Sequence, residues 1–201
     1  MGKANWLFML SIIVIAQLNA TFAGYTELKR ITWAEGNGHT YVLVQFPTSV
    51  TWDFSRQFSE DFDLEKESYL ATITTDNEWL MVRDLVLEPH RRELDQAWLG
   101  ATDRENEGQW KWVTGEVFSF SSPATFDNLD NEDYLVAWRF GPADPLQWND
   151  INDSRNQSNR VLVEISNTAK VPEPSTTCVL LLAIPILTRR RVFLPKRDLE
   201  I

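Results

Sequence analysis

The sequence has few of the residues that carry thiolate, redox and acid–base chemistry. It contains one cysteine, Cys178, and two histidines in 201 residues. A single cysteine excludes an internal disulfide and a multi-thiolate metal site, so the fold must be held by packing alone. His39 and His90 are not accompanied by a Gly-x-Ser-x-Gly elbow, a phosphate loop or a zinc-binding His motif. We therefore expect a protein that is not an enzyme.

Basic residues are also scarce in the middle of the chain. From Gly24 to Lys170 there are 13 Lys and Arg against 26 Asp and Glu, a balance of −13. Because such a domain repels phosphate backbones, we expect no nucleic-acid partner. The many carboxylates suit either cation binding or a solubilising surface, and composition does not decide between the two. Nine Trp residues predict an aromatic core or aromatic ligand contacts.

Hydrophobic runs occur at the two ends of the chain. At the start, Lys3 precedes an apolar run from Trp6 to Ala16, and small residues lead to Ala23. This pattern predicts a signal peptide over residues 1–23, with Ala20 as the alternative end of that segment. The other interpretation is an uncleaved membrane anchor, although the run is short for a membrane span.

The C-terminal segment, residues 171–201, has three parts. They are the sequence Pro172, Glu173 and Pro174, an apolar run from Cys178 to Leu187, and a cluster of three arginines. A short apolar segment stopped by positive charge is typical of a terminus held at the cytoplasmic side of a membrane. The order resembles the PEP-CTERM sorting signal of Gram-negative bacteria. That resemblance implies processing by an exosortase, transient contact of both termini with the inner membrane, and delivery to the cell surface or extracellular matrix. A tail anchor or a disordered C-terminus is the alternative.

Residues 24–170 predict one α+β domain without internal repeats. Phenylalanines spaced by four predict a helix over residues 52–63, and the capping pattern at Thr75–Glu78 predicts a second helix that Pro89 ends. β-Branched and aromatic segments predict short strands, at residues 40–46, 69–73, 97–101, 110–113, 134–138 and 161–165. Helices first and then strands with long polar loops are typical of the α+β class.

Six motifs in this region occur in a recognisable order. They are Gly38–Tyr41, Leu70–Ile73 followed by Thr75–Glu78, Trp98–Gly100, Glu107–Gly115, Trp148–Asp150 and Val161–Ile165. Together they resemble the C-type lectin-like domain over about residues 37–166. The resemblance implies two helices flanking small antiparallel sheets with long loops. The usual cysteines of that family are absent, and Tyr134 stands where one of them would be.

The same resemblance implies an auxiliary calcium site. Asp103 and Glu107 match the spacing of one pair of its ligands, and Glu132 and Asp133 match a second pair. Calcium takes six to eight oxygen ligands from adaptable loops, which suits these residue types. The intervening loop offers further oxygens at Asp127, Asn128 and Asp130. One alternative is that these are solvated loop acids, and another is a glycosidase pair formed by Asp103 and Glu107.

The sugar-binding site implied by the resemblance is only partly present. Trp148, Asn149 and Asp150 match its Trp-Asn-Asp motif, and Asn149 and Asp150, with Glu132, are the expected calcium ligands there. The Glu-Pro-Asn motif that would select the sugar is replaced by residues 122–124, Ser-Pro-Ala. The alternative for Trp148–Asp150 is structural, with Trp in the core and Asn and Asp fixing a loop.

Two functions remain open from the sequence. The first is an exported binding module that recognises a polysaccharide or a surface protein, with calcium as a possible cofactor and with the loop between about residues 120 and 150 as its ligand face. The second is a structural component of the exopolysaccharide matrix that binds no specific small ligand. The retained Trp148–Asp150 motif favours the first, and the missing Glu-Pro-Asn motif favours the second.

Overall fold

The computed structural model describes residues 24–90, 96–119, 124–125, 132–139, 144–152 and 158–171. The chain divides into a unit of residues 1–170 and a unit of residues 171–201. The predicted signal peptide and the motif Pro172–Pro174 lie outside the described residues.

The described strands form one mixed sheet. Its order is β1-β2-β9-β4-β7-β8-β6, with β3 added to β9 and β5 added to β4. Most neighbours are antiparallel, but β4 runs parallel to β9 and β6 runs parallel to β8. The expected α+β fold with two helices is confirmed, and the strands that were expected in small antiparallel sheets form one mixed sheet. The strands are β1 (Thr26–Thr32), β2 (Thr40–Gln45), β3 (Lys66–Leu70), β4 (Gln96–Thr102), β5 (Lys111–Trp112), β6 (Ala124–Thr125), β7 (Tyr134–Trp138), β8 (Gln147–Ile151) and β9 (Arg160–Ala169).

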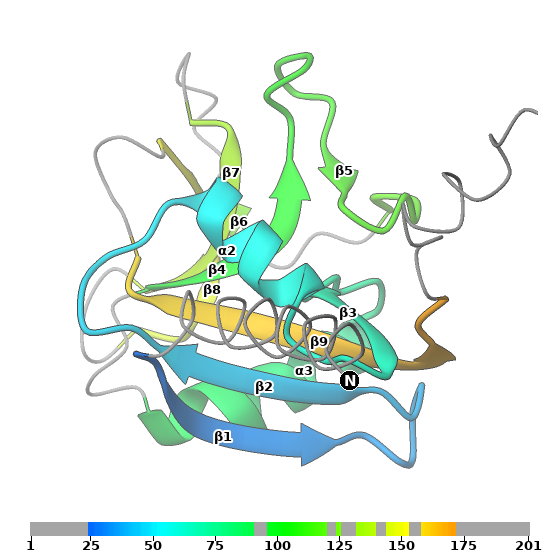
Figure 1. Ribbon diagram of the computed structural model, residues 1–201. Helices are drawn as coiled ribbons and strands as arrows, with labels where there is room; N and C mark the ends of the chain where they lie inside the picture. Colours follow the sequence, from blue (N-terminus) through cyan, green and yellow to red (C-terminus); the bar gives the residue numbers. More distant parts are fainter. Residues whose placement is uncertain are drawn as a thin grey trace, which may run out of the picture. The chain divides into compact units, whose positions relative to one another are not determined.

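Helices cover both faces of this sheet (Figure 1). Helix α2 (Trp52–Glu60) packs on one face, and α3 (Asp76–Met81), continued by the π-helix η1 (Val82–Leu87) and the 3-10 helix η2 (Glu88–His90), packs on the other. The alternation of side chains along a strand explains the two cores. In β2, Leu43 faces α3 and η1, whereas Val44 faces α2.

Both helices begin at a threonine cap. The Thr51 hydroxyl accepts a hydrogen bond from Phe54 N, and the Thr75 hydroxyl accepts one from Glu78 N, each at 3.2 Å. These bonds satisfy amide groups that lack partners inside a first helical turn. The predicted second helix is thereby confirmed, although it continues as π-helix and 3-10 helix up to His90.

Three strands were not expected from the sequence. Strand β1 is largely exposed, β6 has two residues, and β8 contains the Trp148–Asp150 motif that was expected in a site or loop. Strand β3 covers residues 66–70, earlier than the expected 69–73, and the Ala71 amide just past its end still donates to Leu162 O of β9 at 2.9 Å.

Aromatic packing stands in the place of the missing cysteines. Tyr134 lies 5.2 Å from Trp52 and 6.4 Å from Trp98 between ring centroids. Aromatic pairs at such distances stabilise a core beyond the area they bury. This contact ties α2, β4 and β7 together without a covalent bond.

Candidate functional site

The turn that follows β4 is organised by the carboxylate of Asp103. Its Oδ2 accepts a hydrogen bond from Gly108 N at 2.8 Å, and its main-chain oxygen accepts one from Asn106 N at 2.8 Å. Gly108 has a φ of 76°, a conformation that glycine adopts readily. The side chain of Asp103 is 2% exposed, so a charged group has been placed in the interior of the turn.

One oxygen of this carboxylate has no neighbour to satisfy it. Among the described residues, Asp103 Oδ1 is buried and has no hydrogen-bond partner. Burial raises the pKa of the Asp103 carboxyl, the Gly108 N–H opposes that shift, and the nearby Asp133 carboxylate raises the pKa further. A buried ionised oxygen without a donor is costly, which suits a position that a cation neutralises.

Of the other predicted calcium ligands, Glu107 lies within this turn and Asp133 contacts it through the main chain. Asp103 N donates to Asp133 O at 3.3 Å, so the structure brings these two residues together. Glu132 and Asp133 are half-buried at the start of β7, whereas Glu107 is exposed. The candidate loop ligands Asp127, Asn128 and Asp130 lie outside the described residues.

Trp148 lies in the core of the domain. It is fully buried, and its ring centroid lies 5.7 Å from those of both Trp79 and Trp112. Its ligand-binding role stays a prediction, and its burial favours the structural alternative for this residue. A side chain at the centre of an aromatic cluster stabilises the core rather than a bound molecule.

The two residues that follow Trp148 lie in β8. The Asn149 amide donates from Nδ2 to the main-chain oxygen of Asp150 at 2.6 Å, and Asp150 is buried. Their roles in binding remain predictions. Residues 122 and 123 of the altered motif lie outside the described part, and Ala124 pairs with Trp148 in register.

A second group of buried carboxylates was not expected from the sequence. Glu164 in β9 and Glu78 in α3 are both buried, and the Tyr41 hydroxyl donates to Glu78 Oε1 and lies 3.3 Å from Glu164 Oε1. His39 Nδ1 lies 2.6 Å from Glu164 Oε1, and Thr72 N donates to Glu164 Oε2 at 2.9 Å. The available signal was an acidic residue inside an otherwise apolar strand, Val161–Ile165.

Burial and mutual contacts shift the pKa values of the side chains in this cluster. Desolvation raises the pKa of Glu164, while the hydrogen bond with His39 opposes that shift. The same hydrogen bond raises the pKa of His39, and burial raises the pKa of Tyr41. His39, directly before β2, contacts Glu164 of β9, which fits the structural role expected for this side chain.

The described residues contain neither a ready-made metal centre nor a membrane-spanning helix. No three acidic, His or Cys side chains there are grouped so that they could hold a metal ion by themselves. No helix in the same part of the chain is both long and apolar enough for a membrane span.

Comparison with known proteins was made by sequence and by structure. A family model described as "Lectin C-type domain" matches residues 48–162. Halomucin of Haloquadratum walsbyi is 40% identical over 80 residues, which are 39% of this chain and 1% of halomucin. Human "C-type lectin domain family 17, member A" is 30% identical over 135 residues, 64% of this chain and 32% of that protein. The chain thus spans less than two thirds of either relative.

A relative of more similar length is the "Alpha-N-acetylgalactosamine-specific lectin" of Patiria pectinifera. It is 28% identical over 125 residues, covering 61% of this chain and 73% of that protein. Among solved structures, the C-type lectin CEL-I from Cucumaria echinata has a TM-score of 0.50 at 24% identity, over 67% of this chain and 94% of CEL-I. Herring type II antifreeze protein has a TM-score of 0.51 at 18% identity, over 66% and 94%. At these identities the structures bear on the fold alone.

Proposed function

This chain belongs to the C-type lectin domain family, and from that membership we propose that it is an exported saccharide-binding protein whose binding is assisted by calcium. The family's domain is a non-enzymatic binding module, which confirms the expectation that the protein is not an enzyme. Such domains are typically extracellular, and carbohydrate is their implied ligand.

The observation that carries the calcium proposal is the buried, unsatisfied Oδ1 of Asp103. Asp103 would hold the ion together with Asp133, whose main-chain oxygen accepts a hydrogen bond from Asp103 N. Glu132 and Glu107 from the adjoining segments would complete the ligand set. Calcium accepts such mixed carboxylate and carbonyl ligands from loops. When bound, the ion supplies positive charge and fixes the turn between β4 and β5.

The saccharide is assigned to the same end of the domain. Asn149 and Asp150 in β8, with Glu132 at the start of β7, are the proposed ligand residues, and Trp148 supports them from the core. The relative from Patiria pectinifera, an alpha-N-acetylgalactosamine-specific lectin, supports a sugar ligand. A protein of the cell surface is the other ligand consistent with a binding module.

The localisation we propose rests on the two ends of the sequence. Residues 1–23 act as the signal peptide, and residues 171–201, with Pro172, Glu173 and Pro174, act as a PEP-CTERM-like sorting tail that an exosortase-type enzyme removes. The folded domain, residues 24–170, then reaches the cell surface or the extracellular matrix. A second candidate function, a structural matrix component without specific ligand, is favoured by the Ser-Pro-Ala sequence at residues 122–124.

Thermal unfolding with and without calcium tests the cation site. Calcium that binds only the native state raises Tm by mass action, and EDTA should reverse the shift. Asp103→Asn should abolish the calcium-dependent shift while leaving the EDTA form as stable as wild type, because a neutral side chain costs less to bury. Asp84→Asn, on an exposed ion pair with Arg83, is the matched control. An identical calcium shift in wild type and Asp103→Asn would refute the site.

Retention on immobilised polysaccharides tests the saccharide site. We expect wild type to be retained in calcium and released by EDTA, and Asn149→Ala to lose at least tenfold in retention. Equal retention of wild type, Asn149→Ala and Asp150→Ala would refute binding at β8. No retention on any polysaccharide, together with a calcium shift in Tm, would favour the structural component.

A further inference from the structure

A pocket separate from the Asp103 carboxylate opens between α2 and the β4–β5 hairpin. Its volume is about 260 Å³, below the roughly 300–1,000 Å³ of pockets for drug-sized ligands. The size suits one sugar ring rather than a long chain. The pocket is lined by Trp52, Arg56, Glu60, Thr102, Arg104, Glu105, Gln109, Lys111, Trp112 and Val113.

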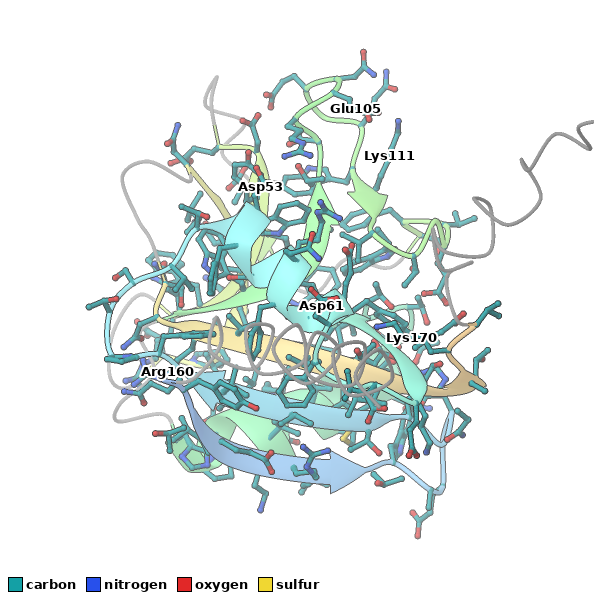
Figure 2. The ribbon with its side chains drawn as sticks, in the orientation of Figure 1. Asp53, Asp61, Glu105, Lys111, Arg160 and Lys170 are labelled. Carbon is teal, nitrogen blue, oxygen red and sulfur yellow. The ribbon has the colours of Figure 1, made fainter. Side chains whose placement is uncertain are left out.

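Three cations converge on this pocket from three different elements. Arg56 comes from α2, Arg104 from the turn after β4, and Lys111 from β5, against two lining carboxylates. Figure 2 shows Lys111 and Glu105 together on the hairpin, near the end of α2 that carries Asp53. Three cations gathered on one small surface are unusual in a domain with twice as many acidic as basic residues, and the carboxylates of Glu60, Asp53 and Glu105 match them one for one.

Each cation is held by an ion pair that a ligand can replace. Arg56 pairs with Glu60 at 2.5 Å, Arg104 with Asp53 at 2.8 Å and Lys111 with Glu105 at 2.6 Å. All six side chains are at least a third exposed, and exposed ion pairs contribute about 0–1 kcal/mol. Exchange of one carboxylate for a ligand carboxylate therefore costs little, and a guanidinium binds a carboxylate in a bidentate way.

Two residues that line the pocket each carry a buried donor without an acceptor among the described residues. Arg56 Nε and the indole Nε1 of Trp112 are buried and have no hydrogen-bond partner among the described residues. Buried donors of this kind are normally satisfied, so an acceptor from a ligand or a water is expected beside them. Both residues line the same pocket, which joins the unmet donors to the cationic lining.

The remaining polar lining groups suit the hydroxyls of a sugar. Gln109 and Thr102 add an amide and a hydroxyl, and Glu60 and Glu105 add acceptors. Trp52 and Trp112 belong to the walls as buried rings of the two cores, and the Arg104 guanidinium carbon lies 5.6 Å from the Trp52 ring centroid. We propose that this pocket is a second, calcium-independent binding site that takes a uronic acid residue of an acidic polysaccharide.

Saturation-transfer NMR on the full chain tests this proposal. The probe is methyl glucuronide, the neutral comparison is methyl glucoside, and all samples contain EDTA. We expect binding of the glucuronide, and at least fivefold weaker or undetectable binding of the glucoside. Arg104→Gln and Lys111→Gln should each weaken glucuronide binding at least fivefold. Arg83→Gln, which removes a cation paired with Asp84 on η1, should leave it unchanged.

Four results would overturn the proposal. They are equal binding of glucoside and glucuronide, competition by acetate with the affinity of the glucuronide, unchanged binding in both pocket variants, and no glucuronide binding by wild type. Circular dichroism establishes that the variants are folded. Because EDTA is present throughout, failure of the calcium-assisted site at Asp103 and β8 leaves this result unaffected, and the two proposals fail separately.

Discussion

At the scale of single residues, the buried pair of His39 and Glu164 governs how stability varies with pH. Both groups have a pKa raised by folding, His39 through its hydrogen bond with Glu164 and Glu164 through desolvation. The native state therefore binds more protons than the unfolded chain, whose His titrates near 6.5. The contribution of His39 is complete below that pH and is lost as the pH rises through its higher folded pKa.

We therefore expect wild type to lose stability between pH 6 and pH 8. Glu164→Gln removes the group that raises the pKa of His39, so the decrease should be smaller in this variant. Urea unfolding midpoints at the two pH values measure the difference. Glu78 and Glu116 also face this cluster, through Tyr41 and Thr72, and remain in the variant as a common background. The same decrease in both proteins would contradict the assignment.

Gly100 is required at its position because there is no space for a Cβ atom. A Cβ added there would lie 2.4 Å from Leu70 O, a main-chain atom that cannot move by itself. Gly100→Ala should reduce the free energy of unfolding by about 3 kcal/mol, at the upper end of overpacking effects. Gly24→Ala, where nothing lies within 4 Å, is the control. Denaturant unfolding measures both, and a loss in Gly100→Ala no larger than in the control would contradict the steric argument.

At the scale of elements, the start of α3 depends on one hydroxyl. Thr75→Ala removes the acceptor for Glu78 N and should lower the free energy of unfolding by about 1 kcal/mol, whereas Thr75→Ser should keep most of it. Urea unfolding of the three proteins measures the effect. If the Ser variant lost as much as the Ala variant, packing of the Thr methyl group would be the cause instead.

Elements with a local signal were predictable, and elements defined by distant contacts were not. Thr75 and Glu78 form a capping pattern of four residues that predicts α3, and Tyr134–Trp138 has the aromatic and β-branched pattern of a strand, β7. Strand β1, TELKRIT, has little apolar alternation and exists because β2 pairs with it. Strand β8 contains Asn and Asp, which disfavour strands, and is fixed by its neighbours β7 and β6.

The two candidate sites differ in the same respect, because only one of them has a local signal in the sequence. The spacing of Asp103 and Glu107 pointed to the turn after β4, where Asp103 does carry an unsatisfied buried oxygen. The pocket of Arg56, Arg104 and Lys111 could not be predicted, because its members come from elements that only tertiary packing brings together. For Trp148 the sequence left two roles open, because the same residue type serves both cores and sugar contacts.

At the scale of the whole molecule, the central strand β9 connects its neighbouring strands with the cores on both faces of the sheet. It pairs with β2, β3 and β4, and its alternate residues enter the cores on both faces of the sheet. A sheet shared by two cores, without a disulfide, should unfold in one transition, because neither core keeps its wall when the other opens.

The end of β9 also defines the C-terminal boundary of the domain. Ala169 pairs with Lys66, Lys170 N donates to Glu65 O at 2.8 Å, and Lys170 Nζ donates to Glu60 O at 2.6 Å. A chain that ends at Ser166 loses these bonds, each contributing about 1 kcal/mol, and should melt several degrees below one that ends at Val171. Calorimetry on chains starting at Gly24 measures the two Tm values. Equal values would place the boundary before Asn167 and would make the last residues of β9 dispensable, whereas the expected loss would place the boundary after Lys170.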